Sequence, residues 1–169
     1  MQKFTNRQNK KIRLAVLMGG PSAEHEVSLN TGRMIFRSLD RTKYTPTKII
    51  VSKTGKWPWP PAQLKNKFDA VFIAMHGEYG EDGTVQLLLE KIGIFYTGSA
   101  SRASRVGMDK VVCHQLFNQI GLRSPRFLAT VNPKKGLVLG LPLVVKPIDR
   151  GSSVGTTIVT RADDLTPAI

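Results

Sequence analysis

His76-Gly77-Glu78-Tyr79-Gly80-Glu81-Asp82-Gly83-Thr84-Val85-Gln86 joins two regular elements that its neighbours predict. The apolar run Ala70–Met75 before it has the length and composition of a buried β-strand. Apolar residues over 85–92 recur as one face of a short helix, and Gly93 is placed to end that helix. Glycines let a backbone turn sharply and approach a ligand closely. The segment therefore predicts a strand, a glycine-rich turn beside a ligand crevice, and a helix. A tight connector whose polar side chains only face water has the same pattern.

Two further strands and a helix precede this segment. Residues 12–18 form an apolar strand, and residues 47–51 form another. Between them, apolar or β-branched side chains recur every four residues and predict one buried helical stripe, made of Val27, Thr31, Ile35 and Leu39. Such alternation of strands and helices predicts an α/β fold, with a mostly parallel sheet flanked by helices on both faces.

The C-terminal part of the chain predicts a different arrangement. Met108-Asp109-Lys110 opens a helix, and strands are expected at 126–130, 141–146 and 156–160, with a helix beginning near residue 163. The last two strands enclose the Gly/Ser-rich tip 147–155. Backbone N–H groups of such a tip can fold over a phosphate chain, although many hairpin tips are only flexible loops.

The charge of the chain is strongly positive. The 169 residues carry 25 Lys plus Arg and 12 Asp plus Glu, a formal net charge of +13. Such an excess often indicates a nucleic acid or an anionic membrane. The bases are scattered, however, and residues 1–11 read as a disordered basic arm. Since no zinc-ligand spacing or RNA-binding signature accompanies the charge, we predict no nucleic-acid partner.

Cysteine content and hydropathy bear on the compartment. The single cysteine, Cys113, excludes an internal disulfide and suits a reducing environment. The early apolar run Leu14–Met18 is too short for a signal sequence or a membrane span. These features predict a cytoplasmic protein with no membrane partner.

Four segments together resemble the signature motifs of D-alanine–D-alanine ligases, which belong to the ATP-grasp superfamily. They are HGEYGEDGTVQ at 76–86, GGPSAEHEVSL at 19–29, YTGS at 96–99 and Lys146-Pro147 followed by GSSVG at 151–155. One departure is Leu87, where the family usually has a small residue. The resemblance covers residues 12–165 but only about the N-terminal half of the family's chain. It implies a Rossmann-like, pre-ATP-grasp substrate domain at 12–107, followed at 108–169 by the first part of an ATP-grasp α+β ATP-binding domain.

The resemblance also implies roles for individual residues. Glu24 would position the ammonium group of the first D-alanine, with His76 beside it hydrogen-bonding the loop or the substrate. Glu26, like Glu24, suits the first turn of a helix, and the resemblance leaves it that structural role. Ser152 would act with Glu24 and a later tyrosine to lock the substrate loop, so Glu24 and Ser152 are the catalytic candidates. The ATP phosphates would be contacted by Lys110, Lys146, Gly151, Ser152 and Ser153.

Glu24, His76 and Ser152 are therefore expected to converge on one pocket beside the nucleotide. The implied reaction joins two D-alanines through an acyl-phosphate intermediate for peptidoglycan synthesis, with ATP and Mg²⁺ as cofactors. The metal ligands are expected outside these residues, none being assigned here. Family members are commonly homodimers.

We expect the 169-residue chain to be a truncated and inactive fragment. Its unpaired sheet edge predicts aggregation or partial disorder beyond about Lys110. Two alternatives stay open. One is a D-alanine–D-lactate-type or other ATP-grasp carboxylate–amine ligase, and the other is a non-catalytic fragment that binds nucleotides or anions through its charge.

Overall fold

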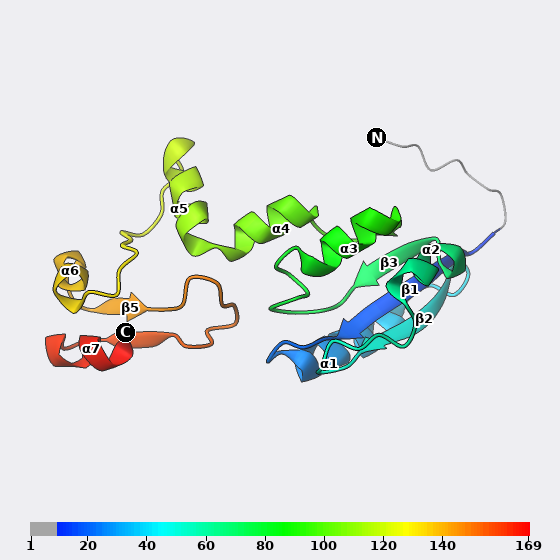
Figure 1. The fold of residues 1–169 in the computed structure, drawn as a ribbon, viewed down its shortest axis with the longest axis horizontal. Helices are drawn as coiled ribbons and strands as arrows, with labels where there is room; N and C mark the ends of the chain where they lie inside the picture. The colour runs from blue at the N-terminus through cyan, green and yellow to red at the C-terminus, as the bar shows by residue number, and fades with distance from the viewer. Residues whose placement is uncertain (1–9) are drawn as a thin grey trace. The chain divides into compact units, whose positions relative to one another are not determined.

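A computed structural model describes residues 10–169, which fall into two compact units. The first unit ends at Ser101 and the second is Arg102–Ile169. Figure 1 follows the chain through both. Most of the predicted basic arm, residues 1–9, lies outside the described residues, while Lys10 and Lys11 are exposed. The expected division after residue 107 concerns substrate and ATP binding, and it stays a prediction.

The first unit is a parallel four-stranded sheet in the order β2-β1-β3-β4. Its elements are β1 (Ile12–Gly19), α1 (His25–Ser38), β2 (Tyr44–Val51), the 3-10 helix η1 (Pro61–Gln63), α2 (Leu64–Lys67), β3 (Ala70–Ile73), α3 (Thr84–Ile92) and β4 (Phe95–Tyr96). The predicted parallel sheet flanked by helices is confirmed. Strand β2 begins before the predicted residue 47, and β3 ends before the predicted residue 75.

Strand β1 is the centre of the core, because its apolar side chains are buried on both faces of the sheet. Ala15 and Leu17 belong to a cluster with residues of α2 and α3. Val16 and Met18 point the other way, into a cluster with residues of α1. Alternate residues of a strand face opposite sides, so a strand covered on both faces reads as a continuous apolar run. Figure 1 shows α1 on one side of the sheet and α2 and α3 on the other.

The buried face of α1 differs from the predicted stripe. Val27 is 51% exposed, and the residues that the helix buries are His25, Ser28, Leu29 and Gly32. A β-carbon at Gly32 would lie 2.6 Å from Met18 Cβ. The helix therefore packs on β1 through Gly32. Val27 lies on a different face of the helix from Gly32 and so points outward.

The second unit contains a short antiparallel hairpin and several short helices. Its elements are α4 (Ser101–Met108, starting at the last residue of the first unit), α5 (Lys110–Gln119), α6 (Pro133–Gly136), η2 (Leu137–Leu139), β5 (Leu143–Val145), β6 (Thr157–Val159), η3 (Ala162–Asp164) and α7 (Leu165–Ala168). The predicted strand at 126–130 is wrong, since these residues have no regular structure. A strand needs a neighbour to take its hydrogen bonds, and β5 and β6 pair with each other within the described sheet.

Burial in the second unit is slight. Among residues 102–169 only Gly136, Val159 and Leu165 are buried. The cross-strand pair Val144 and Ile158 is 54% and 71% exposed. Two strands with one bare apolar face are marginally stable on their own. Within residues 10–169, no helix combines the length and apolar character needed to cross a membrane.

Candidate functional site

The carboxyl ends of β1 and β3 bring two loops to one edge of the sheet. The strands are parallel neighbours, and Ala74 N donates to Leu17 O at 2.8 Å just beyond β3. The first loop, residues 20–24, leads into α1, and the second, residues 74–83, leads into α3. Parallel α/β sheets bind ligands at such an edge.

Two serines tie the loops together through the backbone of His76. His76 N donates to Ser28 Oγ at 2.9 Å, and Ser22 Oγ donates to His76 O at 2.8 Å. Ser22 Oγ also accepts from Glu24 N at 3.0 Å. Both backbone groups of His76 are therefore satisfied from the β1–α1 side, which fixes the start of the glycine-rich turn.

The His76 ring lies between a hydroxyl and a carboxylate. Its Nε2 is 2.9 Å from Thr31 Oγ1, and its Nδ1 is 3.8 Å from Glu81 Oε1. The second distance is too long for a hydrogen bond. Glu81 Oε2 accepts from Gly77 N at 2.8 Å, which keeps the carboxylate on this side of the ring. The His76 side chain is 33% exposed and that of Glu81 53%, so both side chains are partly open to solvent.

Glu24, the last residue of the first loop, lies against the glycine-rich turn. Gly77 has a φ of +71°, and a β-carbon there would be 2.5 Å from Glu24 Oε2 and 3.2 Å from Ser22 Oγ. The half-buried Glu24 carboxylate thus rests against Gly77, the residue that follows His76. The structure brings Glu24 and His76 together, as the motifs predict. A carboxylate and an imidazole that lie near each other suit a small zwitterion.

Glu26 has a different environment. It lies in the first turn of α1, its side chain is 68% exposed, and its Oε1 is 3.3 Å from Lys53 Nζ. An acidic side chain in the first turn of a helix stabilises that helix, and an exposed ion pair with a lysine adds little to it. These two interactions account for Glu26 without a role in ligand binding. Glu26 therefore provides a matched comparison for Glu24.

The turn before α3 is braced by Asp82. Its Oδ2 accepts from Tyr79 N and its Oδ1 from Thr84 N, both at 2.9 Å. Desolvation alone would raise the pKa of Asp82, but these hydrogen bonds outweigh it and the pKa is lowered. Tyr79 adopts a φ of 70°, and its hydroxyl accepts from Trp57 Nε1 at 2.8 Å. The loop that carries Trp57 thus supports the turn.

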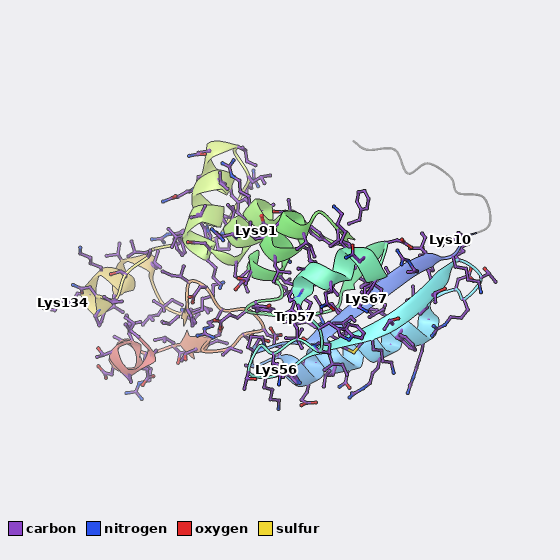
Figure 2. All side chains as sticks on the ribbon, turned by 45° about the vertical axis from the view of Figure 1, so that its right-hand side comes forward. Lys10, Lys56, Trp57, Lys67, Lys91 and Lys134 are labelled. Atoms are coloured by element: carbon purple, nitrogen blue, oxygen red, sulfur yellow. The ribbon has the colours of Figure 1, made fainter. Side chains whose placement is uncertain are left out.

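Basic side chains come from several parts of the first unit. Lys56 and Trp57 come from the loop after β2 and Lys67 from α2, whereas Lys10 precedes the opposite end of β1 (Figure 2). Lys67 Nζ lies 5.5 Å from the centre of the Trp59 ring, and two other cations, Arg41 and Lys48, cover Phe36. Several basic side chains therefore pack on aromatic rings, which is consistent with a positive charge spread over the surface of this unit.

In the second unit, Lys110 is attached to the Gly/Ser-rich loop. Its backbone N–H donates to Ile148 O at 3.2 Å. Its ammonium group donates to Ile148 O at 3.1 Å and to Arg150 O at 2.5 Å. Asp109 caps the helix that begins at Lys110, its Oδ1 accepting from Val111 N at 2.9 Å. Lys110 therefore reaches the loop for which the motifs predict phosphate contacts.

The loop itself has an unusual backbone. Ser152 and Ser153 have φ values of 52° and 60°, and both are exposed, while Gly151 is half-buried. Val154 N donates to Gly151 O at 3.0 Å, closing the turn. Lys146 is exposed directly after β5. Left-handed residues at a loop tip can form anion-binding concavities. Ser152 belongs to the second unit, so its convergence with Glu24 and His76 stays a prediction.

Sequence reasoning missed the hydroxyl groups that hold His76. Ser28 and Thr31 are three residues apart on α1, and residues at this spacing lie on one helix face. Thr31 is assigned above to an apolar stripe because of its branched side chain. The signal in the sequence was a pair of hydroxyl side chains that share one face of the helix following the first loop. Among the described side chains, no group of three or more His, Cys, Asp or Glu is arranged to hold a metal ion.

Comparison with known proteins decides the family. A family model described as the D-ala D-ala ligase N-terminus matches residues 13–66 and 58–99. The chain belongs to the D-alanine–D-alanine ligase family. The predicted resemblance to the N-terminal half of these ligases is confirmed, and the match includes Glu24 and His76.

Individual ligases agree with this assignment. A D-alanine–D-alanine ligase of Geobacter sulfurreducens is 41% identical over 172 residues, with 98% of this chain and 52% of the relative covered. The crystal structure of D-alanyl-alanine synthetase A from Vibrio cholerae has a TM-score of 0.83 at 25% identity, covering 94% of this chain and 54% of that one. A Bacillus anthracis D-alanine–D-alanine ligase complexed with ATP has a TM-score of 0.75 at 35% identity, covering 92% and 53%. The chain spans about half the length of the curated relatives it matches.

Proposed function

We propose that this chain forms the first D-alanine site and part of the ATP site of an ATP-dependent D-alanine–D-alanine ligase, which makes the dipeptide of peptidoglycan through an acyl phosphate. The observation that carries the proposal is the contact of the Glu24 carboxylate with Gly77, next to His76, at the carboxyl edge of the sheet. This pair lies within the segment that matches the family model.

The groups of Glu24 and His76 suit a small amino acid in its zwitterionic form. The Glu24 carboxylate would accept hydrogen bonds from the ammonium group, a charge-assisted contact of the stronger kind. The His76 side chain is partly exposed, and its Nδ1–H would donate to the substrate carboxylate. Two contacts of opposite polarity on one small molecule orient it as well as bind it, which brings its carboxylate into line for phosphorylation.

Lys110, Lys146 and the 151–153 loop would contact the phosphates of ATP, with Ser152 as a second catalytic candidate beside Glu24. The contact of Lys110 with the loop and the left-handed backbone of Ser152 and Ser153 support this role. The similar Bacillus anthracis ligase complexed with ATP supports the choice of nucleotide. Mg²⁺, when bound, neutralises phosphate charge in such reactions, and its ligands would come from outside residues 10–169. We further propose a homodimer in the cytoplasm, where the single thiol of Cys113 stays reduced.

The 169 residues span about half the length of their curated relatives, so a polypeptide of these residues alone should not turn over. A hybrid protein tests the proposal: this chain, followed by the C-terminal half of the Geobacter sulfurreducens relative.

The hybrid should release ADP from ATP only when D-alanine is present, and L-alanine should not replace it. The 169-residue chain alone should release none above background. A well-folded hybrid that hydrolyses ATP equally with and without D-alanine would contradict the proposal. Offering D-lactate or D-serine beside D-alanine distinguishes ligases that use a different second substrate.

A further inference from the structure

Helix α1 holds His76 at two points. Ser28 Oγ accepts from His76 N at 2.9 Å, and Thr31 Oγ1 is 2.9 Å from His76 Nε2. The two hydroxyls are one helical turn apart on the same face of α1. One helix therefore fixes both the backbone and the ring of the histidine, although 45 residues separate Thr31 from His76.

The group on the opposite side of the ring favours one of the two neutral tautomers. Nδ1 faces the Glu81 carboxylate at 3.8 Å. An ionised carboxylate only accepts hydrogen bonds, so it favours a proton on the nitrogen that faces it. In a neutral imidazole, Nε2 is then the acceptor, and the Thr31 hydroxyl must be its donor.

We propose that Thr31 is a positioning residue, which holds the His76 ring with Nε2 toward α1 and so presents Nδ1–H to the ligand. The Glu81 carboxylate is itself held by the Gly77 N–H at 2.8 Å, so it stays on the Nδ1 side. A hydroxyl can also accept from Nε2–H when the ring is protonated, which keeps the ring orientation in both charge states. The role in substrate binding rests on the proposed function, whereas the ring orientation and tautomer do not.

The tautomer can be measured on the 169-residue chain itself. Long-range ¹H–¹⁵N correlation spectra at a pH where His76 is neutral distinguish protonated from unprotonated ring nitrogens. The native chain should show Nδ1–H and an unprotonated Nε2. Thr31→Ser keeps the hydroxyl and should preserve this state. Thr31→Val keeps the shape and removes the donor, so the ratio of the two tautomers should fall by about threefold to tenfold, the range for one ordinary hydrogen bond.

Two results would overturn the proposal: an Nε2–H tautomer in the native chain, or the native tautomer ratio in a folded Thr31→Val chain. If Thr31→Val does not fold, the native chain and Thr31→Ser still decide the question, because both must show Nδ1–H. In the hybrid ligase, Thr31→Val should raise KM for D-alanine more than it lowers kcat, and Thr31→Ser should restore KM. A native tautomer as expected together with a hybrid that ignores D-alanine would contradict the proposed function and leave the positioning role intact.

Discussion

The carboxylate of Glu24 rests against the α-carbon of Gly77, so close that a β-carbon at Gly77 would be 2.5 Å from Glu24 Oε2. The two residues come from different loops, one after β1 and one after β3. Their contact places the Glu24 carboxylate against the glycine-rich turn. The position of the Glu24 carboxylate is therefore sensitive to a single methyl group at Gly77.

Gly77→Ala should damage substrate binding beyond its effect on stability. Gly77 and Gly55 have similar left-handed φ values of +71° and +77°, but a β-carbon at Gly55 meets nothing within 4 Å. Both alanine variants should lose about 1–2 kcal/mol of unfolding free energy because of the backbone conformation. In the hybrid ligase, only Gly77→Ala should raise KM for D-alanine, by about tenfold or more. Equal KM values for the two variants would show that the contact with Glu24 has no part in binding.

Lys110→Ala should loosen the Gly/Ser-rich loop. The ammonium group donates to two loop carbonyls, those of Ile148 and Arg150, and hydrogen bonds of a charged donor contribute about 1.5–3 kcal/mol. Trypsin cleavage after Arg150 should therefore become about tenfold faster. Lys146→Ala removes an equal charge near the same loop and should leave that rate nearly unchanged. Identical cleavage rates in the two variants would contradict the anchoring role of Lys110.

Asp69 should contribute to the acid sensitivity of the first unit. The hydrogen bond from the Arg13 side chain is the main cause that holds the pKa of Asp69 below its ordinary value, and Arg13 Nη2 lies 2.8 Å from Asp69 Oδ1. A carboxyl group whose pKa is lower in the folded than in the unfolded state stabilises the protein at pH values above the unfolded pKa, about 3.9. This stabilisation is lost as the pH falls through the folded pKa. Asp69→Asn should therefore flatten the loss of stability below about pH 4. Denaturant unfolding at several pH values measures this, and an unchanged slope would count against it.

The two units should differ in hydrogen exchange. In the first, Ala15, Val16 and Leu17 have no exposed surface, whereas only three residues of 102–169 are buried. Amides of β1 should exchange slowly and those of β5 and β6 fast, by at least about a hundredfold. Mass spectrometry of peptic peptides measures both. Equal protection of β1 and the β5–β6 hairpin would disprove the expectation that the chain is less ordered beyond about Lys110.

The local sequence pattern predicts those strands and helices whose position depends on nearby residues. Strand β1 reads as a continuous apolar run because both faces of the sheet are covered. Helix α3 ends at Gly93, which has a φ of 68°, a conformation suited to glycine. The motifs also predicted that Glu24 and His76 lie near each other. Parallel strands place the loops at their carboxyl ends at the same edge of the sheet.

Other features depend on contacts that periodicity does not reveal. The segment 126–130 has the composition of a strand but no strand beside it. Val27 faces outward because Gly32 brings α1 against Met18, a packing contact between distant residues. Thr31 has the shape of a core residue, and only the position of His76 gives its hydroxyl a partner.

The central claim is that Glu24 binds the ammonium group of the first D-alanine, and the pair Glu24→Gln and Glu26→Gln tests it most directly. Each variant removes one carboxylate charge within two positions of the start of α1. In the hybrid ligase, Glu24→Gln should lower kcat/KM for D-alanine by about 10–100-fold. Glu26→Gln, which loses only an exposed ion pair with Lys53, should change it by less than about twofold. Equal effects of the two substitutions, or none from Glu24→Gln, would contradict the account.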